Sequence, residues 1–199
     1  MPDITRRAMF GAAAAAAVPA GLPLVRLVTS LGVVVVRLRP DAAPLSARDF
    51  LKYVDNGAYD GGRFFRVVRA DNDRGHPRID VVQGGIRPGL KQGPPVAHET
   101  TQRSGLRHLD GTISLTRDAP GTGSGAEFFI CVGPQPALDF GGTRNRDLQG
   151  FAAFGRVMSG MDVIRNVWQQ DAGGVSPDQY TIGQILTKPV LITKALRIG

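Results

Sequence analysis

Short runs of β-branched and aromatic residues alternate with turn-forming residues along most of this chain. Residues 25–29 and 32–38 are two such runs, and the dipeptide Ser30-Leu31 between them predicts a β-hairpin. We therefore expect most of the chain to form short strands. The other predicted strands are residues 63–68, 79–84, 112–116, 128–132, 151–157 and 190–198.

Helical spacing of apolar residues is limited to two segments, residues 46–56 and 161–168. Ser46 is a candidate N-cap for the first helix, and Asn56-Gly57 is a typical helix end. Strands that are not regularly interleaved with helices predict a mainly β fold rather than a doubly wound sheet. We expect a closed eight-stranded antiparallel β-barrel capped by two α-helices.

Three polar or glycine-rich segments are predicted to be loops. Residues 70–78 are expected to form a solvated turn; their Asp-Asn-Asp sequence is similar to a calcium loop, but the third ligand position is missing. Residues 88–107 contain few apolar residues and are expected to form a surface loop. Residues 119–125 lack the Gly-Lys-Ser/Thr sequence of a phosphate-binding loop.

The composition fits one globular domain with many turns. The chain has 199 residues, of which 26 are glycine and 14 are proline. A formal net charge of +7 would suit nucleic acid, but the basic residues are scattered, so we expect no nucleic-acid partner. Cys131 is the single cysteine, which excludes an intramolecular disulfide, and we expect it to be a buried, inert thiol.

The N-terminal residues have the pattern of an export signal. Arg6-Arg7 is followed by a weakly apolar run with alanines at 12–17 and by small residues up to Ala20. The pattern is similar to a twin-arginine signal peptide, so residues 1–20 are expected to be cleaved off after Ala20. The run is too short to span a bilayer core of about 30 Å, so we expect no stable membrane insertion.

Export of this kind would place the mature domain, residues 21–199, in the periplasm of a bacterium. If residues 1–20 instead form an alanine-rich helix of the fold, the protein would be cytoplasmic. A reporter fused to residues 1–25 separates the two interpretations, because only a signal peptide directs it out of the cytoplasm.

Common catalytic constellations are missing from the sequence. His76, His98 and His108 are isolated from one another and from a plausible cysteine ligand, so we expect no metal site. Ser114 and Ser124 lack the Gly-x-Ser-x-Gly sequence of a nucleophile elbow. The glycine fingerprint of a dinucleotide-binding fold is also missing, and we expect no cofactor.

The remaining chemical signal is one arginine within an apolar strand. Side chains alternate between the two faces of a strand, so Phe64, Arg66 and Val68 are expected to share one face. Burial of a guanidinium among apolar residues is unfavourable unless it has a partner or a task. We interpret the segment as part of an apolar groove with one cationic hydrogen-bond donor.

Six short motifs occur in the following order: Phe-Phe-Arg-Val-Val at 64–68, Val-Gln-Gly-Gly at 82–85, Gly-Thr-Ile-Ser-Leu-Thr-Arg at 111–117, Glu-Phe-Phe-Ile at 127–130, Leu-Asp at 138–139 and Phe-Gly-Arg-Val at 154–157. Together they resemble the cyclophilins, the family of peptidyl-prolyl cis–trans isomerases, across residues 24–198. The resemblance implies an eight-stranded barrel with a helix at each end, and proline-containing polypeptides as substrates. We expect a monomeric bacterial enzyme, without cofactor, that assists the folding of exported proteins.

The same resemblance assigns roles to individual residues. Arg66 takes the place of the family's essential arginine, and Gln83 that of the glutamine that holds the substrate backbone. Phe129 matches the phenylalanine at the floor of the proline pocket, and Leu138 matches the leucine on its wall. Phe151 falls where the family often has histidine or another aromatic residue.

Other substrate-binding positions depart from the family pattern. Thr116 stands where an alanine usually lines the groove, and Glu127 replaces a glutamine, which adds negative charge to the groove. Counting back without gaps places Val81 and Asp80 at the pocket wall. The longer loop before them makes Ile79 an alternative wall residue.

A prolyl isomerase needs no nucleophile or general base, because no covalent bond is broken. In this interpretation Arg66 donates a hydrogen bond to the prolyl nitrogen as that nitrogen loses its amide resonance. Two alternatives stay open. Arg66 can be a structural ion-pair partner of Glu127, and the groove can belong to a prolyl-peptide-binding chaperone or scaffold with little turnover.

Overall fold

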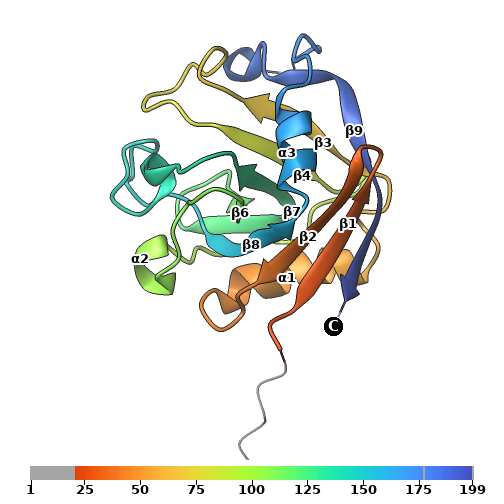
Figure 1. Cartoon of the computed structure of the whole chain (residues 1–199). Helices are drawn as coiled ribbons and strands as arrows, with labels where there is room; N and C mark the ends of the chain where they lie inside the picture. The colour runs from red at the N-terminus through yellow and green to blue at the C-terminus, as the bar shows by residue number, and fades with distance from the viewer. Residues whose placement is uncertain (1–20, 177, 199) are drawn as a thin grey trace, which may run out of the picture.

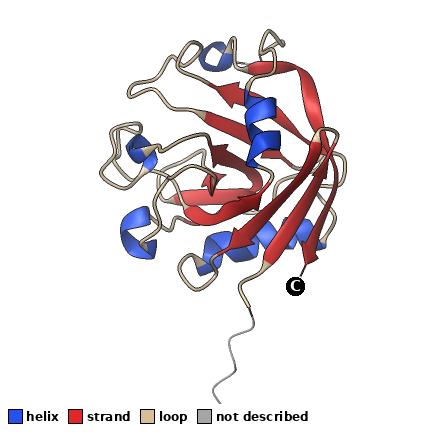
Figure 2. Ribbon diagram, in the orientation of Figure 1, coloured by secondary structure: helices blue, strands red, loops and turns tan. Residues whose placement is uncertain are grey.

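A closed antiparallel β-barrel with helices at its ends forms the body of the protein (Figures 1 and 2). The computed structural model describes residues 21–176 and 178–198. The barrel strands are, in spatial order, β4 (Val81–Gly85), β3 (Gly62–Val68), β9 (Ile185–Ile198), β1 (Leu24–Thr29), β2 (Gly32–Leu38), β8 (Ala153–Ser159), β6 (Thr112–Thr116) and β7 (Thr122–Cys131). β4 also pairs with β7, which closes the ring and leaves no free sheet edge among these strands. The predicted eight-stranded antiparallel barrel is therefore confirmed.

The two predicted helices are present as α1 (Pro44–Asp55) and α3 (Met161–Trp168). Figure 1 shows α1 at the lower end of the barrel and α3 at the upper end. A short third helix, α2 (Thr101–Ser104), and a two-residue strand, β5 (Val96–Ala97), lie in the segment 88–107. The prediction of an irregular loop there is wrong at these two places, because β5 pairs with β7 and α2 has its own cap at Thr100.

The N-terminus of α1 is capped by Glu99 rather than by Ser46. The Glu99 carboxylate accepts hydrogen bonds from the backbone N–H groups of Leu45 at 3.1 Å and Ser46 at 2.8 Å. The Ser46 hydroxyl also donates to it at 2.7 Å, and Ala43 occupies the N-cap position without a side-chain bond. The predicted Ser46 cap is wrong, because a carboxylate distant in sequence supplies the acceptor.

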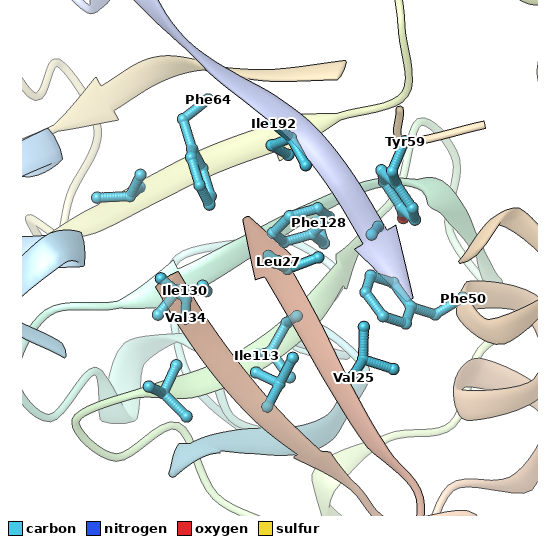
Figure 3. Packing of buried hydrophobic residues seen from close by; sticks show 14 of the residues in the cluster. Val25, Leu27, Val34, Phe50, Tyr59, Phe64, Ile113, Phe128, Ile130 and Ile192 are labelled. Atoms are coloured by element: carbon cyan, nitrogen blue, oxygen red, sulfur yellow. The ribbon is translucent and has the colours of Figure 1, made fainter. Parts of the chain in front are cut away.

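Aliphatic side chains and a cluster of aromatic rings fill the barrel interior (Figure 3). The centroid of the Phe50 ring lies 5.1 Å from that of Tyr59 and 5.5 Å from that of Phe128, and Phe64 packs on Phe128 at 5.8 Å. All four side chains are fully buried, and burial of one such ring contributes about 2–3 kcal/mol. Since the interior is filled, a substrate site must lie on the outside of the barrel wall.

A β-bulge at Phe65 decides which side chains of β3 face outward. Phe64 pairs with Gly84 and Arg66 pairs with the next residue, Gln83, so Phe65 is an extra residue without a partner on β4. Phe64 points into the core, whereas Phe65 and Arg66 both lie on the outer face. The prediction that Phe64 shares the face of Arg66 is therefore wrong, because the bulge interrupts the alternation.

Several strand boundaries differ from the prediction. β7 begins at Thr122, inside the segment 119–125 that was expected to be a loop, and β9 begins at Ile185 rather than at residue 190. β8 begins at Ala153, so Phe151 lies just before the strand. Pairing with neighbouring strands extends or shortens these elements beyond their apolar runs.

The predicted signal peptide, residues 1–20, lies outside the described residues. In the described part of the chain, no helix is long and apolar enough to cross a membrane.

Candidate active site

A cavity of about 230 Å³ lies on the outer face of the barrel, over β3, β4 and β7. All eight predicted site residues line it. Phe129 and Phe151 form its apolar end, with ring centroids 5.2 Å apart and ring planes at 88°. Leu138 is fully buried beside them. The cavity has the size and the apolar lining that suit a proline ring.

The sequence does not decide which of residues 79–81 form the pocket wall. In the structure Ile79 and Val81 line the cavity, whereas Asp80 is not among the lining residues. Ile79 is held by its neighbouring turn, because its backbone N–H donates to the Asp73 carboxylate at 2.9 Å. Asp73 is buried and forms a two-pronged ion pair with Arg144 at 2.7 and 2.8 Å. The expectation of a fully solvated turn over residues 70–78 is therefore wrong at Asp73.

The Phe129 ring rests on a buried histidine. His108 stacks on it with a centroid distance of 5.9 Å and an interplanar angle of 17°. His108 Nδ1 lies 2.8 Å from a carboxylate oxygen of Asp139, and Nε2 lies 3.2 Å from the Ser114 hydroxyl. These bonds fix the plane of the imidazole and hence support the pocket floor.

Two glutamine side chains hold the Arg66 guanidinium. Its Nη1 donates to Gln83 Oε1 at 2.8 Å, while Nε and Nη2 donate to Gln184 Oε1 at 2.9 and 2.6 Å. Gln83 Nε2 in turn donates to a carboxylate oxygen of Glu127 at 2.7 Å. Among the described residues no ion pair joins Arg66 to Glu127, since Gln83 lies between them.

Burial has opposite effects on the two charged groups of this network. Desolvation lowers the pKa of Arg66, yet an arginine stays charged at neutral pH because its ordinary pKa lies above about 12. Desolvation raises the pKa of Glu127; the hydrogen bond from Gln83 opposes this effect, and the charge of Asp118 adds to it. The groove therefore combines a permanent cation with a carboxyl group that is harder to ionise than usual.

A second arginine supports the aromatic end of the cavity. Arg117 follows β6, and its guanidinium carbon lies 5.4 Å from the centroid of the Phe151 ring. Its two terminal nitrogens donate to both carboxylate oxygens of Asp147 at 2.6 and 2.7 Å. Thr116, the residue before it, directs its hydroxyl to the backbone oxygen of Glu127 at 3.4 Å. The ion pair thus fixes the ring that closes the pocket.

The hydrogen-bonded chain of Asp139, His108 and Ser114 beneath Phe129 is buried, so it presents no accessible nucleophile to the groove. Within the part of the chain that the structure describes, no group of three or more potential ligand side chains could hold a metal ion. Cys131 is fully buried behind the pocket, and burial raises the pKa of its thiol, which disfavours the reactive thiolate. The geometry offers an apolar pocket, amide hydrogen-bonding groups and, at its rim, the Arg66 guanidinium, which has no ion-pair partner among the described residues, whereas Arg117 is paired with Asp147.

Comparison with known proteins decides the family. Residues 24–195 match the family model described as cyclophilin type peptidyl-prolyl cis-trans isomerase/CLD. The chain belongs to this family. It is 36% identical to the peptidyl-prolyl cis-trans isomerase A of Dickeya dadantii over 174 residues, which cover 86% of this chain and 82% of that protein. It is 31% identical to the peptidyl-prolyl cis-trans isomerase B of Escherichia coli over 176 residues, 86% and 96% of the two chains.

Solved structures confirm the cyclophilin fold. The crystal structure of a cyclophilin type isomerase from Cryptosporidium parvum superposes with a TM-score of 0.67 at 16% identity and covers 89% of this chain and 98% of that one. The family and its curated relatives confirm the predicted enzyme class, a peptidyl-prolyl cis–trans isomerase that acts on proline-containing polypeptides.

Sequence reasoning missed three residues of this cyclophilin site. The motif at residues 111–117 includes Arg117 but does not indicate its ion pair with Asp147. The isolated position of His108 in the sequence argues against a metal site and gives no sign that its ring packs on Phe129. Gln184 stands between Gly183 and Ile185, outside every motif and before the predicted strand at residues 190–198, so no local signal marks it.

Proposed function

We propose that this cyclophilin catalyses rotation about X–Pro bonds in exported proteins, with Arg66 as the residue that stabilises the twisted amide. The observation that carries the proposal is the position of Arg66 at the rim of an apolar pocket, where neutral amides hold its guanidinium. The pocket binds the proline ring, and Gln83 positions the flanking peptide.

The barrier to be lowered is the resonance of the amide, about 20 kcal/mol. As the bond twists, the prolyl nitrogen becomes pyramidal and its lone pair is no longer delocalised into the carbonyl, so it can accept a hydrogen bond from Arg66. This bond strengthens only in the twisted state, so it accelerates rotation rather than merely binding substrate. A barrier lowered by about 6–7 kcal/mol accelerates the reaction roughly 10⁵-fold.

An exchange assay tests this mechanism. The cis–trans exchange rate of a proline-containing peptide is measured with residues 21–199 and with their Arg66→Ala variant. We expect kcat/KM to fall at least about tenfold, a loss of more than ~1.4 kcal/mol of transition-state stabilisation, with an unchanged unfolding transition. Full activity in the variant would sink the mechanism, and peptide binding without faster exchange in the unmodified protein would favour the scaffold alternative.

The role in export rests on the sequence of residues 1–20, which pairs two arginines with a mildly apolar alanine run. We expect a reporter fused to residues 1–25 to reach the periplasm, and its Arg6→Lys, Arg7→Lys variant to stay in the cytoplasm. Retention of the unmodified fusion in the cytoplasm would remove the export part of the proposal and leave the isomerase part unaffected.

A further inference from the structure

Gln184 meets the Arg66 guanidinium on the side away from Gln83. A single acceptor atom, Gln184 Oε1, receives both Nε at 2.9 Å and Nη2 at 2.6 Å. The Gln184 side chain is fully buried and is not among the residues that line the cavity. It therefore contacts Arg66 from behind, without access to a peptide in the groove.

The orientation of the Gln184 amide is determined by its second hydrogen bond. Its Nε2 donates to the backbone oxygen of Asn72 at 3.0 Å, so the amide oxygen is directed to the guanidinium. A flipped amide would place donors against the donors of Arg66 and leave the Asn72 oxygen without this partner. The backbone oxygen of Gln184 also accepts the N–H of Val67 at 2.9 Å, next to Arg66 in β3.

Asn72 is itself held in place. Its Nδ2 donates to the backbone oxygen of Gly183 at 2.9 Å, and its Oδ1 accepts the backbone N–H of Arg69 at 2.8 Å. Hydrogen bonds of Asn72 with Gly183 and with Gln184 therefore hold the turn after β3 against the segment before β9. Because these hydrogen bonds hold its side chain and the backbone beside it, Gln184 cannot easily shift if the Arg66 guanidinium moves.

Only some of the N–H bonds of the Arg66 guanidinium are used by the two glutamines. An arginine side chain has five N–H bonds. Gln184 engages those of Nε and Nη2, one each, and Gln83 engages one of Nη1, which makes three. Two N–H bonds, one on each terminal nitrogen, therefore have no partner among residues 21–176 and 178–198. Because a guanidinium is planar, its fixed plane also fixes the directions of these two bonds.

We propose that Gln184 is a positioning residue for prolyl isomerisation: it fixes the plane of the Arg66 guanidinium so that the remaining N–H bonds meet the prolyl nitrogen. The inference rests on the proposed role of Arg66. A neutral amide suits the task, because a carboxylate in its place would form an ion pair and reduce the positive potential at the groove. A misplacement of about 1 Å in a catalytic group can lower the rate by up to roughly 10²-fold.

A double-mutant cycle tests the proposal. Gln184→Met keeps the side-chain volume and removes the acceptor; kcat and KM are measured for this change in the unmodified mature protein and in the Arg66→Ala background. In the unmodified mature protein we expect Gln184→Met to lower kcat about tenfold and to change KM by less than about twofold, since the pocket is intact. In the Arg66→Ala background we expect the same change to alter kcat less than about twofold, because Gln184 acts only through Arg66.

Two results would overturn the proposal. Unchanged kcat for Gln184→Met would show that Arg66 needs no such support. An equal fall in both backgrounds would show a general structural role that does not pass through Arg66. If Gln184→Met does not fold, Gln184→Asn replaces it, because it keeps the amide and shortens the side chain by one methylene.

The outcome is also separable from that of the proposed function. If Arg66→Ala retains full activity, the proposed mechanism fails first, whatever Gln184 does. If Arg66→Ala loses activity and Gln184→Met does not, only the positioning role fails. The Arg66 Nε–H resonance, assigned from its loss in Arg66→Ala, gives a direct readout: we expect slow hydrogen exchange in the unmodified protein and fast exchange in Gln184→Met.

Discussion

Arg66 stays charged in a partly buried groove because of its high ordinary pKa, and its side-chain partners in the described part of the chain are neutral, so none of them offsets that charge. Gln83 and Gln184 accept its hydrogen bonds without neutralising it. The nearest carboxylate in this network, Glu127, is reached only through Gln83. The positive potential is thus available to a developing lone pair, but it depends on the charge state of Glu127.

The first prediction concerns this dependence on Glu127. Burial raises the pKa of Glu127, so the group ionises above the ordinary range of a glutamic acid. As pH rises through that pKa, the new negative charge weakens the field of Arg66, and we expect kcat/KM to fall about threefold, or ~0.6 kcal/mol. Glu127→Gln keeps an oxygen that accepts the Gln83 bond and should remove this fall.

The measurement is kcat/KM from about pH 4 to pH 8 for both proteins. Parallel pH profiles for the unmodified protein and Glu127→Gln would contradict the electrostatic coupling. A higher plateau for Glu127→Gln near neutral pH, combined with a flat profile, is the expected result.

At the scale of elements, the sequence predicts what depends on local pattern and misses what depends on distant partners. The strands and α3 follow from apolar runs and helical spacing, and α3 has the predicted limits. The bulge at Phe65 arises from the registers of β3 with β4, which no local pattern specifies. Glu99 caps a helix that is distant in sequence, and Gln184 reaches Arg66 across the chain, so neither could be inferred from its neighbours.

The second prediction concerns the packing of α1 on β7. A Cβ atom on Gly125 would lie 2.7 Å from the backbone nitrogen of Phe50, inside the helix. Backbone atoms of a packed helix cannot yield easily, so we expect Gly125→Ala to lower the free energy of unfolding by about 1–3 kcal/mol. Gly173→Ala is the matched control, because its Cβ would meet only side-chain atoms at 3.5 Å or more. Urea unfolding measures both, and equal stability of the two variants would contradict the close-packing argument.

The third prediction concerns the segment that connects the pocket to β8. Hydrogen bonds from Arg117 lower the pKa of Asp147 to about 2. A carboxyl group with a lowered pKa in the folded state stabilises the protein above its unfolded pKa, and this contribution is lost as pH falls through the folded value. We expect the stability difference between the unmodified protein and Asp147→Asn to shrink between about pH 4 and pH 2. If the difference in free energy of unfolding between the two proteins stays constant over this pH range, the ion pair contributes nothing to stability.

For the whole molecule, closure of the barrel joins the two ends of the described chain. Leu24 at the start of β1 pairs with Ile198 at the end of β9. Figure 1 shows the start of β1 and the end of β9 at the lower end of the barrel. The strand that closes the ring on one side therefore begins only a few residues after the predicted cleavage site. The family match also begins at residue 24. We therefore expect residues 21–199 to fold as a unit without residues 1–20.

The last prediction follows from that closure. We expect removal of residues 1–20 to change Tm by no more than about 2 °C and to leave kcat/KM unchanged, because β1 and its pairing with β2 and β9 stay complete. Removal of residues 1–29 is the control: it deletes β1, exposes the edges of β2 and β9, and should abolish cooperative unfolding. Calorimetry and the exchange assay on the three proteins measure both effects. A large loss of stability on removal of residues 1–20 alone would favour the alternative in which this alanine-rich segment is part of the fold, and would argue against a cleaved signal peptide.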